Sequence, residues 1–411
     1  MSENKVKRKP QGGIKQFIAQ GGIDVPFFAL LVAIIVIGLV MLFSATYVYA
    51  YYYEKGDSAF YFKKQLLWVL IGFVLMVVIS HIDLERFKFL FAVVGTGASW
   101  LFLGLALLMP AHNGTRRHVY LPGGIQFQPS DIAKFALILT LAALLSEFHN
   151  VVVSKKPLQG KIASKVNDFF HKPVLNDSLK IILICGGIIA VYAGLVALGS
   201  HLSGTALILI IGVIMLFLGE VRKKWFAAGF VAALAAIGIL YQFDVLKTYM
   251  KERFIAWWDK SYEPLGARWQ VNQALYAIGS GGLLGKGLGQ STLKHLYVSE
   301  PQNDMIFSIV VEELGFVGAA LILILFALLI WRGVVIGINN PSRYKALIAM
   351  GVVFQLGVQV VLNILVATDS IPNTGISLPF FSYGGTAYVI TLIEMGFVLS
   401  ISRSSKLRRQ K

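Results

Sequence analysis

Charged side chains beside long apolar runs are the first candidates for chemistry in this sequence. Asp304 comes directly before the apolar run that starts at Met305, and Glu312 and Glu313 follow it by eight and nine residues. On a helix the two glutamates would lie about two turns deeper than Asp304. A carboxylate at the water boundary ionises at little cost, whereas a deep one does not. Asp304 is therefore expected to be ionised, and the glutamates are expected to pair with a cation, to be protonated, or to form contacts between helices.

Cations precede another apolar run. Arg116 and Arg117 stand upstream of Gln128, Ser130 and Lys134. The stretch from Gln128 has the composition of a helix start, with Ser130 as the expected cap, so Lys134 would lie within one turn of it. Two interpretations stay open for Lys134: an anion site shared with the arginines, or a lysine that extends to the membrane surface.

A glycine-rich stretch lies between Gly279 and Gly289, inside a long segment that has no membrane span. It lacks the GxxxxGK[ST] spacing and no strand precedes it, so a nucleotide-binding loop is not expected. Residues 268–277 have helical spacing typical of a helix at a membrane surface. We expect the glycines to form a turn between two short amphipathic helices.

The composition indicates an all-α polytopic integral membrane protein. Of 411 residues, 56% are hydrophobic and 14% charged, against about 25% charged in soluble domains, and the mean hydropathy is +0.71.

Ten apolar stretches are long enough to cross a membrane: Val25–Tyr47, Gln65–Ile82, Phe89–Pro110, Ile132–Phe148, Leu179–Gly199, Leu202–Leu218, Trp225–Phe243, Met305–Ile330, Leu347–Ala367 and Phe381–Ile401. Only Ser200 and His201 separate the fifth of these spans from the sixth, so one long broken helix is the alternative there.

The distribution of lysine and arginine predicts the orientation. Of the 37, 24 fall on the side of the termini and twelve on the other, with Lys134 inside a span, so both termini are expected in the cytoplasm. Residues 1–24 and 402–411 would be basic cytoplasmic tails around a membrane domain at 25–401, with an extracellular loop at 244–303. Topology explains most of the net charge of +16 without nucleic acid. The seven cations of the outer loop indicate either an anionic substrate or a long loop that crosses regardless of charge.

The single cysteine, Cys185, stands inside an apolar run. One cysteine permits no intramolecular disulfide and no cysteine metal cluster, so a packing role is expected.

Four motifs in order resemble one family. They are RRHVYLPGGIQFQPSDIAK (116–134), WQVNQALYAIGSGGLLGKGLGQS (269–291), DMIFSIVVEELGF (304–316) and IPNTGISLPFFSYGGT (371–386). Together they resemble the SEDS family (shape, elongation, division and sporulation) of bacterial cell-wall polymerases, and the similarity extends from the first span to Arg403. The ending IEMGFVLSISR is more similar to the division and sporulation branch than to the rod-elongation branch.

The resemblance implies a ten-span peptidoglycan glycosyltransferase in the bacterial cytoplasmic membrane. Such a protein polymerises lipid II on the outer face and works with a class B penicillin-binding transpeptidase and other division or elongation proteins. By the resemblance, Asp304 matches the essential acid and Lys134 matches its apparent ion-pair partner. No organic cofactor is implied.

Lipid II polymerisation sets the chemistry expected of these residues. A hydroxyl attacks an anomeric carbon and pyrophosphate leaves, so the reaction needs a base near the hydroxyl and cations near the leaving group. We expect Asp304 as the base and Lys134 as its partner. The other candidates are substrate-binding residues: Arg116 and Arg117 for phosphate, and Gln128, Ser130, Trp269, Gln270, Gln273, Lys286 and Ser382 for the rest of the substrate.

Two other classes of function stay open at this stage. A flippase for lipid-linked precursors would also carry polar groups in its spans, and a division scaffold would need no chemistry. A divalent cation could bridge the pyrophosphate, although the sequence contains no cluster of metal ligands.

Overall fold

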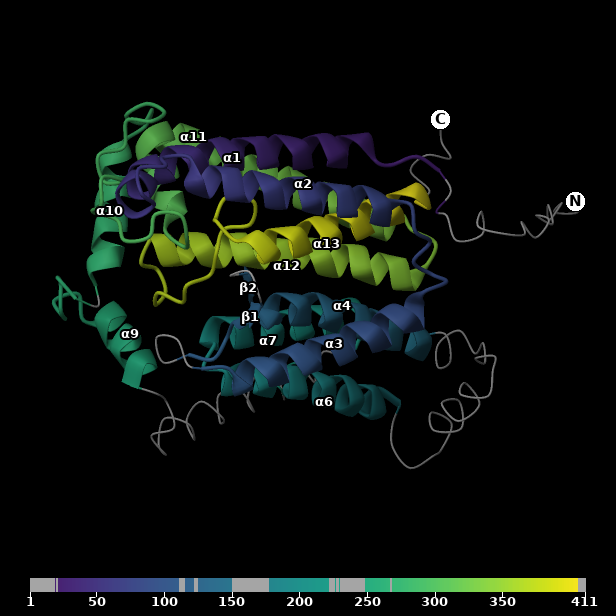
Figure 1. Ribbon diagram of the computed structural model, residues 1–411. Helices are drawn as coiled ribbons and strands as arrows, with labels where there is room; N and C mark the ends of the chain where they lie inside the picture. The colour runs from purple at the N-terminus through teal and green to yellow at the C-terminus, as the bar shows by residue number, and fades with distance from the viewer. Residues whose placement is uncertain are drawn as a thin grey trace, which may run out of the picture.

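A computed structural model describes residues 19, 21–110, 115–121, 125–149, 177–221, 226, 229, 248–266 and 268–405. Long helices run side by side in a bundle, and two shorter helices, α9 and α10, lie at one end of it (Figure 1). The helices are α1 (Val25–Tyr53), α2 (Phe60–Ser80), α3 (Lys88–Leu108), α4 (Pro129–Phe148), α6 (Asp177–Leu198), α7 (Leu202–Leu218), α9 (Thr248–Trp258), α10 (Trp269–Gly281), α11 (Ile306–Ile338), α12 (Arg343–Ala367) and α13 (Gly385–Arg403).

The predicted α-helical membrane class is confirmed. Seven of the described helices are long and apolar enough to cross a membrane, namely α1, α2, α3, α6, α11, α12 and α13. In the same bundle lie α4, with charged residues at both of its ends, and α7, which has 17 residues. The break between α6 and α7 at Ser200 shows two helices there instead of one long one. Nearly all of the predicted span Trp225–Phe243 lies outside the described residues, so the total of ten stays a prediction.

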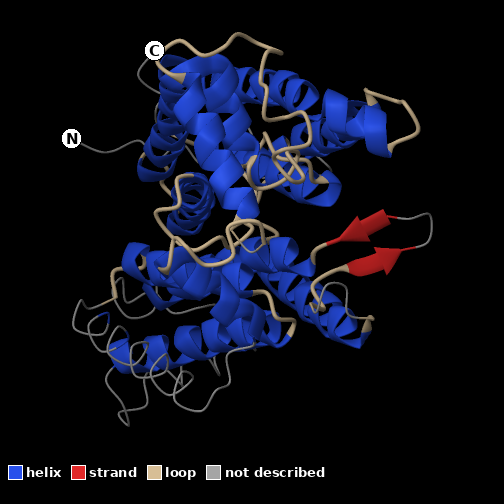
Figure 2. Ribbon diagram, turned by 90° about the vertical axis from the view of Figure 1, so that its left-hand side faces the viewer, coloured by secondary structure: helices blue, strands red, loops and turns tan. Residues whose placement is uncertain are grey.

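The helices pack in two groups that meet where α4 and α7 lie against α12 and α13. In one group α1, α2, α11, α12 and α13 are neighbours, and in the other α3, α4, α6 and α7 are neighbours (Figures 1 and 2). One continuous apolar core joins them, with α4 buried along most of its length. The buried Cys185 belongs to this core, as expected of a packing residue.

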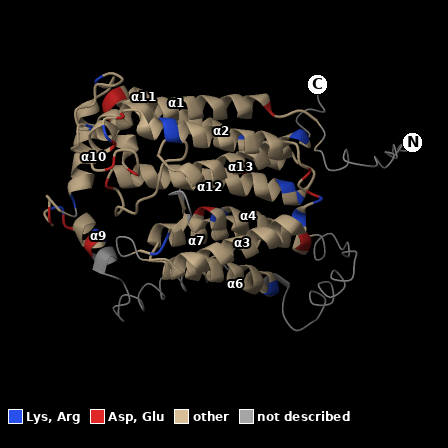
Figure 3. Ribbon diagram, viewed as in Figure 1, with Lys and Arg blue, Asp and Glu red and all other residues tan. Residues whose placement is uncertain are grey.

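Ion pairs bind the helices at the end of the bundle where α1 begins and α13 ends, here called the termini end. Asp24 caps α1 and accepts both Arg332 Nε at 2.9 Å and Arg332 Nη2 at 2.8 Å. Lys345 pairs with Asp83 at 2.7 Å. Figure 3 shows charged residues gathered at the two ends of the bundle, which is the distribution expected of a protein that crosses a membrane.

The opposite end, here called the far end, carries α9 and α10 (Figure 1). Of the two amphipathic helices expected around the glycines, α10 forms, but residues 282–305 make turns and no second helix. The helix α9 and the antiparallel hairpin of β1 (Val119–Leu121) and β2 (Ile125–Phe127) were not predicted. Each strand has three residues, too short for a recognisable alternating pattern.

Gly315 breaks α11 near its start, with φ 69° and ψ −175°. The loop after α10 pairs with the backbone on both sides of the break: Phe316 N–H donates to Gly282 O and Lys286 N–H donates to Glu312 O, each at 2.9 Å. A Cβ at position 315 would lie 2.3 Å from the backbone of that loop. The close approach and the positive φ both require glycine here, and the break fixes the glycine-rich loop against the start of α11.

Candidate active site at the far end

Asp304 lies one residue before Met305, the residue that caps α11, and its backbone is held by two distant segments. The side chain of Asn363, on α12, donates from Nδ2 to Asp304 O at 2.7 Å and to Ile376 O at 2.7 Å. The hydroxyl of Ser382 donates to Asn303 O at 2.7 Å. Asn363 is completely buried, so α12 and the loop before α13 together fix the position of the acid.

The carboxylate of Asp304 is partly exposed and has few partners. Gln270 donates to Oδ1 at 3.3 Å and accepts a hydrogen bond from Asn373 at 3.1 Å. The other oxygen faces Gly375, where a Cβ would lie 3.8 Å from Oδ2. Of the predicted substrate-binding residues, Gln270 is therefore the one that the structure brings into contact with Asp304.

Burial raises the pKa of the Asp304 carboxyl above that of an ordinary aspartate. Its own backbone N–H, Arg253 and Arg117 act in the opposite direction, and Glu300 acts with burial. A carboxylate with a raised pKa is a stronger base, which is the property that proton abstraction near neutral pH requires.

Two arginines, Arg253 and Arg117, act electrostatically on this carboxylate. Arg253, on α9, donates to Asn373 O at 2.7 Å. Together with Arg268 and Gln270 it lines a cavity of about 220 Å³ between α9 and α10. Sequence reasoning missed Arg253 as a site residue, although it is one of the seven cations that made the outer loop unusual.

Arg116 is exposed and donates to Leu107 O at 3.0 Å. Its neighbour Arg117 is half-buried, and its Nε has no hydrogen-bond partner among the described residues. The two arginines, adjacent in sequence, thus have different surroundings, and Arg117 is the one associated with Asp304.

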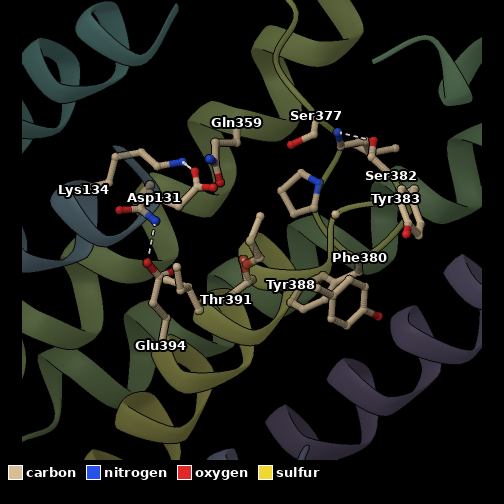
Figure 4. A pocket seen from close by; sticks show the side chains of 16 residues that line it. Asp131, Lys134, Gln359, Ser377, Phe380, Ser382, Tyr383, Tyr388, Thr391 and Glu394 are labelled. Atoms are coloured by element: carbon tan, nitrogen blue, oxygen red, sulfur yellow. Dashed lines mark hydrogen bonds and ion pairs between the residues drawn. The ribbon is translucent and has the colours of Figure 1, made fainter. Parts of the chain in front are cut away.

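Lys134 does not form the predicted ion pair with Asp304. Its ammonium lies 2.8 Å from Asp131, one turn away on the same helix, and both side chains are largely buried. Figure 4 shows the pair pointing toward Gln359 on one side of a small polar cavity, whose other wall is the loop before α13. The predicted ion pair between Lys134 and Asp304 is therefore wrong, because Lys134 pairs with Asp131 on its own helix.

The same cavity continues to Glu394 on α13, which accepts a hydrogen bond from Gln355 on α12 at 2.8 Å (Figure 4). Glu394 is 2% exposed. Glu394 thus forms a contact between α13 and α12.

Gln128 is the residue that caps α4, and Ser130 lies inside the first turn. The prediction that Ser130 caps this helix is therefore wrong. Gln128 donates to Ser130 Oγ at 2.9 Å and lies 3.2 Å from the ring nitrogens of His201. Burial, Arg117 and Lys134 together lower the pKa of His201 to about 3. The imidazole is therefore neutral at physiological pH.

Glu312 and Glu313 are both completely buried and both pair with a lysine, as expected for deep acids. Lys286 lies 2.6 Å from Glu312, and Lys294 lies 2.6 Å from Glu313. Lys286, predicted to bind substrate, is thus engaged in an ion pair and remains 30% exposed. These pairs hold the glycine-rich loop on the broken helix α11.

The other predicted substrate-binding residues have mainly structural contacts. Trp269 donates to Tyr297 O at 3.1 Å, and Gln273 is buried within α10. Ser382 accepts a hydrogen bond from Leu378 N–H at 2.8 Å. Their roles toward a substrate stay predictions.

The fold and this site define a class: a multi-pass membrane protein with one partly exposed acid, basic near neighbours and a cavity at the far end of the bundle. The profile of a family described as "Cell cycle protein", named for FtsW, RodA and SpoVE, matches residues 25–407. The chain belongs to this family, which is the family that the sequence motifs resemble.

Curated relatives match over nearly their whole length. Stage V sporulation protein E of Bacillus subtilis is 34% identical over 382 residues, which is 91% of this chain and 95% of the relative. A protein named probable peptidoglycan glycosyltransferase FtsW, from Geobacter sp. strain M18, is 33% identical over 386 residues, covering 93% and 97%. A third, with the same name, from Coxiella burnetii, is 32% identical over 382 residues, covering 90% and 93%.

Solved structures share the fold. One, described as structural coordination of polymerization and crosslinking by a peptidoglycan synthase complex, has a TM-score of 0.71 and 28% identity, and covers 93% of this chain and 98% of that one. The crystal structure of the Thermus thermophilus rod shape determining protein RodA has a TM-score of 0.63 and 25% identity, covering 93% and 97%.

Proposed function

We propose that this protein is a peptidoglycan glycosyltransferase that polymerises lipid II on the outer face of the bacterial cytoplasmic membrane. The observation that carries the proposal is Asp304: a partly exposed acid with a raised pKa, fixed by its backbone and close to two arginines. The names of the relatives from Geobacter and Coxiella support the same activity.

In the proposed reaction, Asp304 accepts the proton of the attacking sugar hydroxyl. The oxygen of that hydroxyl bonds to the anomeric carbon of a second lipid II. The bond from that carbon to the pyrophosphate breaks, and the leaving group carries the electron pair away. Arg117 and Arg253 stabilise the negative charge that develops on it. Attack opposite the leaving group inverts the configuration at that carbon. A single base supplies about 10²- to 10⁴-fold of the rate enhancement, so orientation and charge stabilisation supply the rest.

Gln270 is proposed to hold the carboxylate in position for this step. It joins Asp304 to Asn373 by two hydrogen bonds of 3.3 Å and 3.1 Å. The catalytic role first expected of Lys134 stays a prediction, since its ammonium pairs with Asp131. In that position the lysine contributes positive potential beside His201 and Glu394 without neutralising the base.

A divalent cation that accompanies the pyrophosphate also stays a prediction. The described residues contain no group of three His, Cys, Asp or Glu side chains that could hold a metal ion. Such a cation would therefore arrive with the substrate, and assays in MgCl₂ and in EDTA test it.

The orientation with both termini in the cytoplasm is proposed from the lysine and arginine distribution. The proposed partner is a class B penicillin-binding transpeptidase, with other division or elongation proteins. The similar solved structure of a peptidoglycan synthase complex supports such a partner.

The test is polymerisation of labelled lipid II by the purified protein with its transpeptidase, comparing wild type with Asp304→Asn. This substitution keeps the shape and removes the base, so we expect no glycan strands. The control is Asp259→Asn, an exposed acid of the same outer segment whose carboxylate accepts hydrogen bonds only from Ser261 among the described residues. Polymer from Asp304→Asn at the wild-type rate would refute the mechanism.

The two other classes of function give different results in the same experiment. A flippase would move labelled lipid II across a vesicle membrane and make no polymer. A scaffold would support growth equally well with Asp304→Asn at matched protein levels.

A further inference from the structure

A dense group of tyrosines lies where α1 ends at the far end of the bundle. The sequence from Tyr47 to Tyr53 contains five tyrosines in seven residues. With 29 residues and a rise of about 1.5 Å per residue, α1 is about 43 Å long, whereas the hydrocarbon core of a bilayer is about 30 Å thick. The helix is therefore longer than the hydrocarbon is thick, and its last turns lie at the end of the bundle that holds Asp304 (Figure 1).

The rings form a connected row that starts beside the candidate active site. Tyr383 contacts Tyr61 edge to face, with centroids 5.1 Å apart. Tyr61 lies 6.0 Å from Tyr49, which lies 4.5 Å from Tyr53. On the same last turn of α1 lie Tyr51 and Tyr52, whose rings are 5.7 Å apart, and these six tyrosines are here called the tyrosine row.

The inner end of the tyrosine row, Tyr383, is hydrogen-bonded to the chain segment that carries Asp304. Tyr383 N–H donates to Gln302 O at 2.7 Å, two residues before the acid. Gln302 is 5% exposed, and its Oε1 has no hydrogen-bond partner among the described residues. The row thus leads from a buried amide beside the site to open surface.

The outer end of the row is strongly exposed. Tyr51, Tyr52 and Tyr53 are 57%, 66% and 63% exposed. Consecutive helical residues point about 100° apart, so the three rings cannot all face lipid as an interfacial belt would. Polar groups flank them: Tyr61 donates to Glu54 at 3.2 Å, and exposed charged residues follow in the turn before α2.

A carbohydrate polymer fits this surface. Tyrosine offers an apolar ring face and a hydroxyl, which match the C–H face and the hydroxyl groups of a sugar ring. A glycan strand that passes around the end of α1 would contact these rings one after another. An apolar protein or lipid partner would leave the exposed tyrosine hydroxyls without hydrogen-bond partners, which is unfavourable.

We propose that the tyrosine row binds the nascent glycan strand and keeps it attached between additions, so that polymerisation is processive. The inference rests on the proposed function, because it assigns a binding surface to the product of that reaction. The row would set strand length without taking part in bond formation.

The experiment replaces Tyr51, Tyr52 and Tyr53 together, by leucine in one variant and by phenylalanine in another. Leucine keeps an apolar surface suited to lipid, while phenylalanine also keeps the aromatic ring. Strand length and initial rate are measured with labelled lipid II and the transpeptidase partner. We expect the leucine variant to make strands about fivefold shorter at an initial rate within about twofold of wild type, and the phenylalanine variant to resemble wild type. Equal strand lengths in the leucine variant and wild type would overturn the proposal.

The control for aromatic exposure is Tyr276→Leu. Tyr276 is 62% exposed on α10 and does not belong to the row. We expect strands of wild-type length from this variant. Shortening equal to that of the triple leucine variant would show that any exposed tyrosine has this effect, which would also overturn the proposal.

Binding of a soluble β-1,4-linked N-acetylglucosamine pentamer, measured by saturation-transfer NMR, separates this inference from the proposed function. We expect about tenfold weaker binding for the triple leucine variant, corresponding to about 1.4 kcal/mol, and unchanged binding for Asp304→Asn. If wild type makes no polymer, the proposed function fails while the pentamer still tests the row. If wild type makes polymer and the leucine variant binds the pentamer normally, the inference alone fails.

Discussion

The buried ion pair of Lys294 and Glu313 provides the sharpest prediction for stability. Both side chains are completely buried, with the ammonium 2.6 Å from the carboxylate. Glu313 also accepts a hydrogen bond from Ser44 at 2.6 Å, and Lys294 lies 4.8 Å from the ring centre of Tyr47. The pair therefore joins α1, α11 and the loop after α10, and Lys294→Met leaves a buried carboxylate with no cation.

Removal of one partner from a buried pair costs about 3–5 kcal/mol. The matched control is Lys286→Met. Lys286 lies at the same 2.6 Å from Glu312 but is 30% exposed, and Glu312 keeps hydrogen bonds from Thr292 and Ser291. We expect its loss to cost about 1 kcal/mol.

The assay is thermal unfolding followed with a thiol-reactive fluorophore. Cys185 is the single cysteine and is completely buried, so it reacts only when the bundle opens. A chain of this size loses roughly 1–2 °C per kcal/mol. We expect the melting temperature to fall by about 5 °C for Lys294→Met and by about 1 °C for Lys286→Met.

The double variant Lys294→Met, Glu313→Gln tests the reason for the loss. Because glutamine carries no charge and still accepts from Ser44, the double variant should be more stable than Lys294→Met alone. Equal melting temperatures for Lys294→Met and Lys286→Met, or losses that simply add in the double variant, would refute the reasoning.

Three further predictions concern the site, the loop and the termini end. The polymerisation rate should fall as the pH falls through the raised pKa of Asp304, because the base acts as a carboxylate. The midpoint of the pH–rate profile should lie above about 3.9, the pKa of an ordinary aspartate. A midpoint at or below that value would contradict the argument that burial raises this pKa. Gly281→Ala should reduce the yield of folded protein strongly, since the added Cβ would lie 2.2 Å from a backbone oxygen of α11. Gly279→Ala should be tolerated, because a Cβ there would have nothing within 4 Å. Size-exclusion chromatography in detergent compares the two yields, and equal yields would argue against the close approach at Gly281. Arg332→Lys should lower the melting temperature by about 1–2 °C, because lysine cannot make both hydrogen bonds to Asp24, and Arg332→Met should lower it further; no difference between lysine and methionine would show that the bidentate geometry is unimportant.

The class of protein and most of the helices follow from the pattern of residues alone. Apolar runs of about twenty residues can be satisfied only as helices in a membrane, so the spans are visible without a structure. The acid at Asp304 was also visible, because a carboxylate before an apolar run is unusual. The deep acids Glu312 and Glu313 were expected to need cations, and the structure supplies Lys286 and Lys294.

Which charged groups meet depends on how the helices and loops pack. Lys134 had two possible acids, and Asp131 takes it because residues three apart on a helix are already neighbours, whereas a contact with Asp304 depends on how α4 packs beside α11. Arg253 and Asn363 reach Asp304 from segments about fifty to sixty residues away. No spacing rule applies over that distance, because the folded backbone and not the local period brings such residues together.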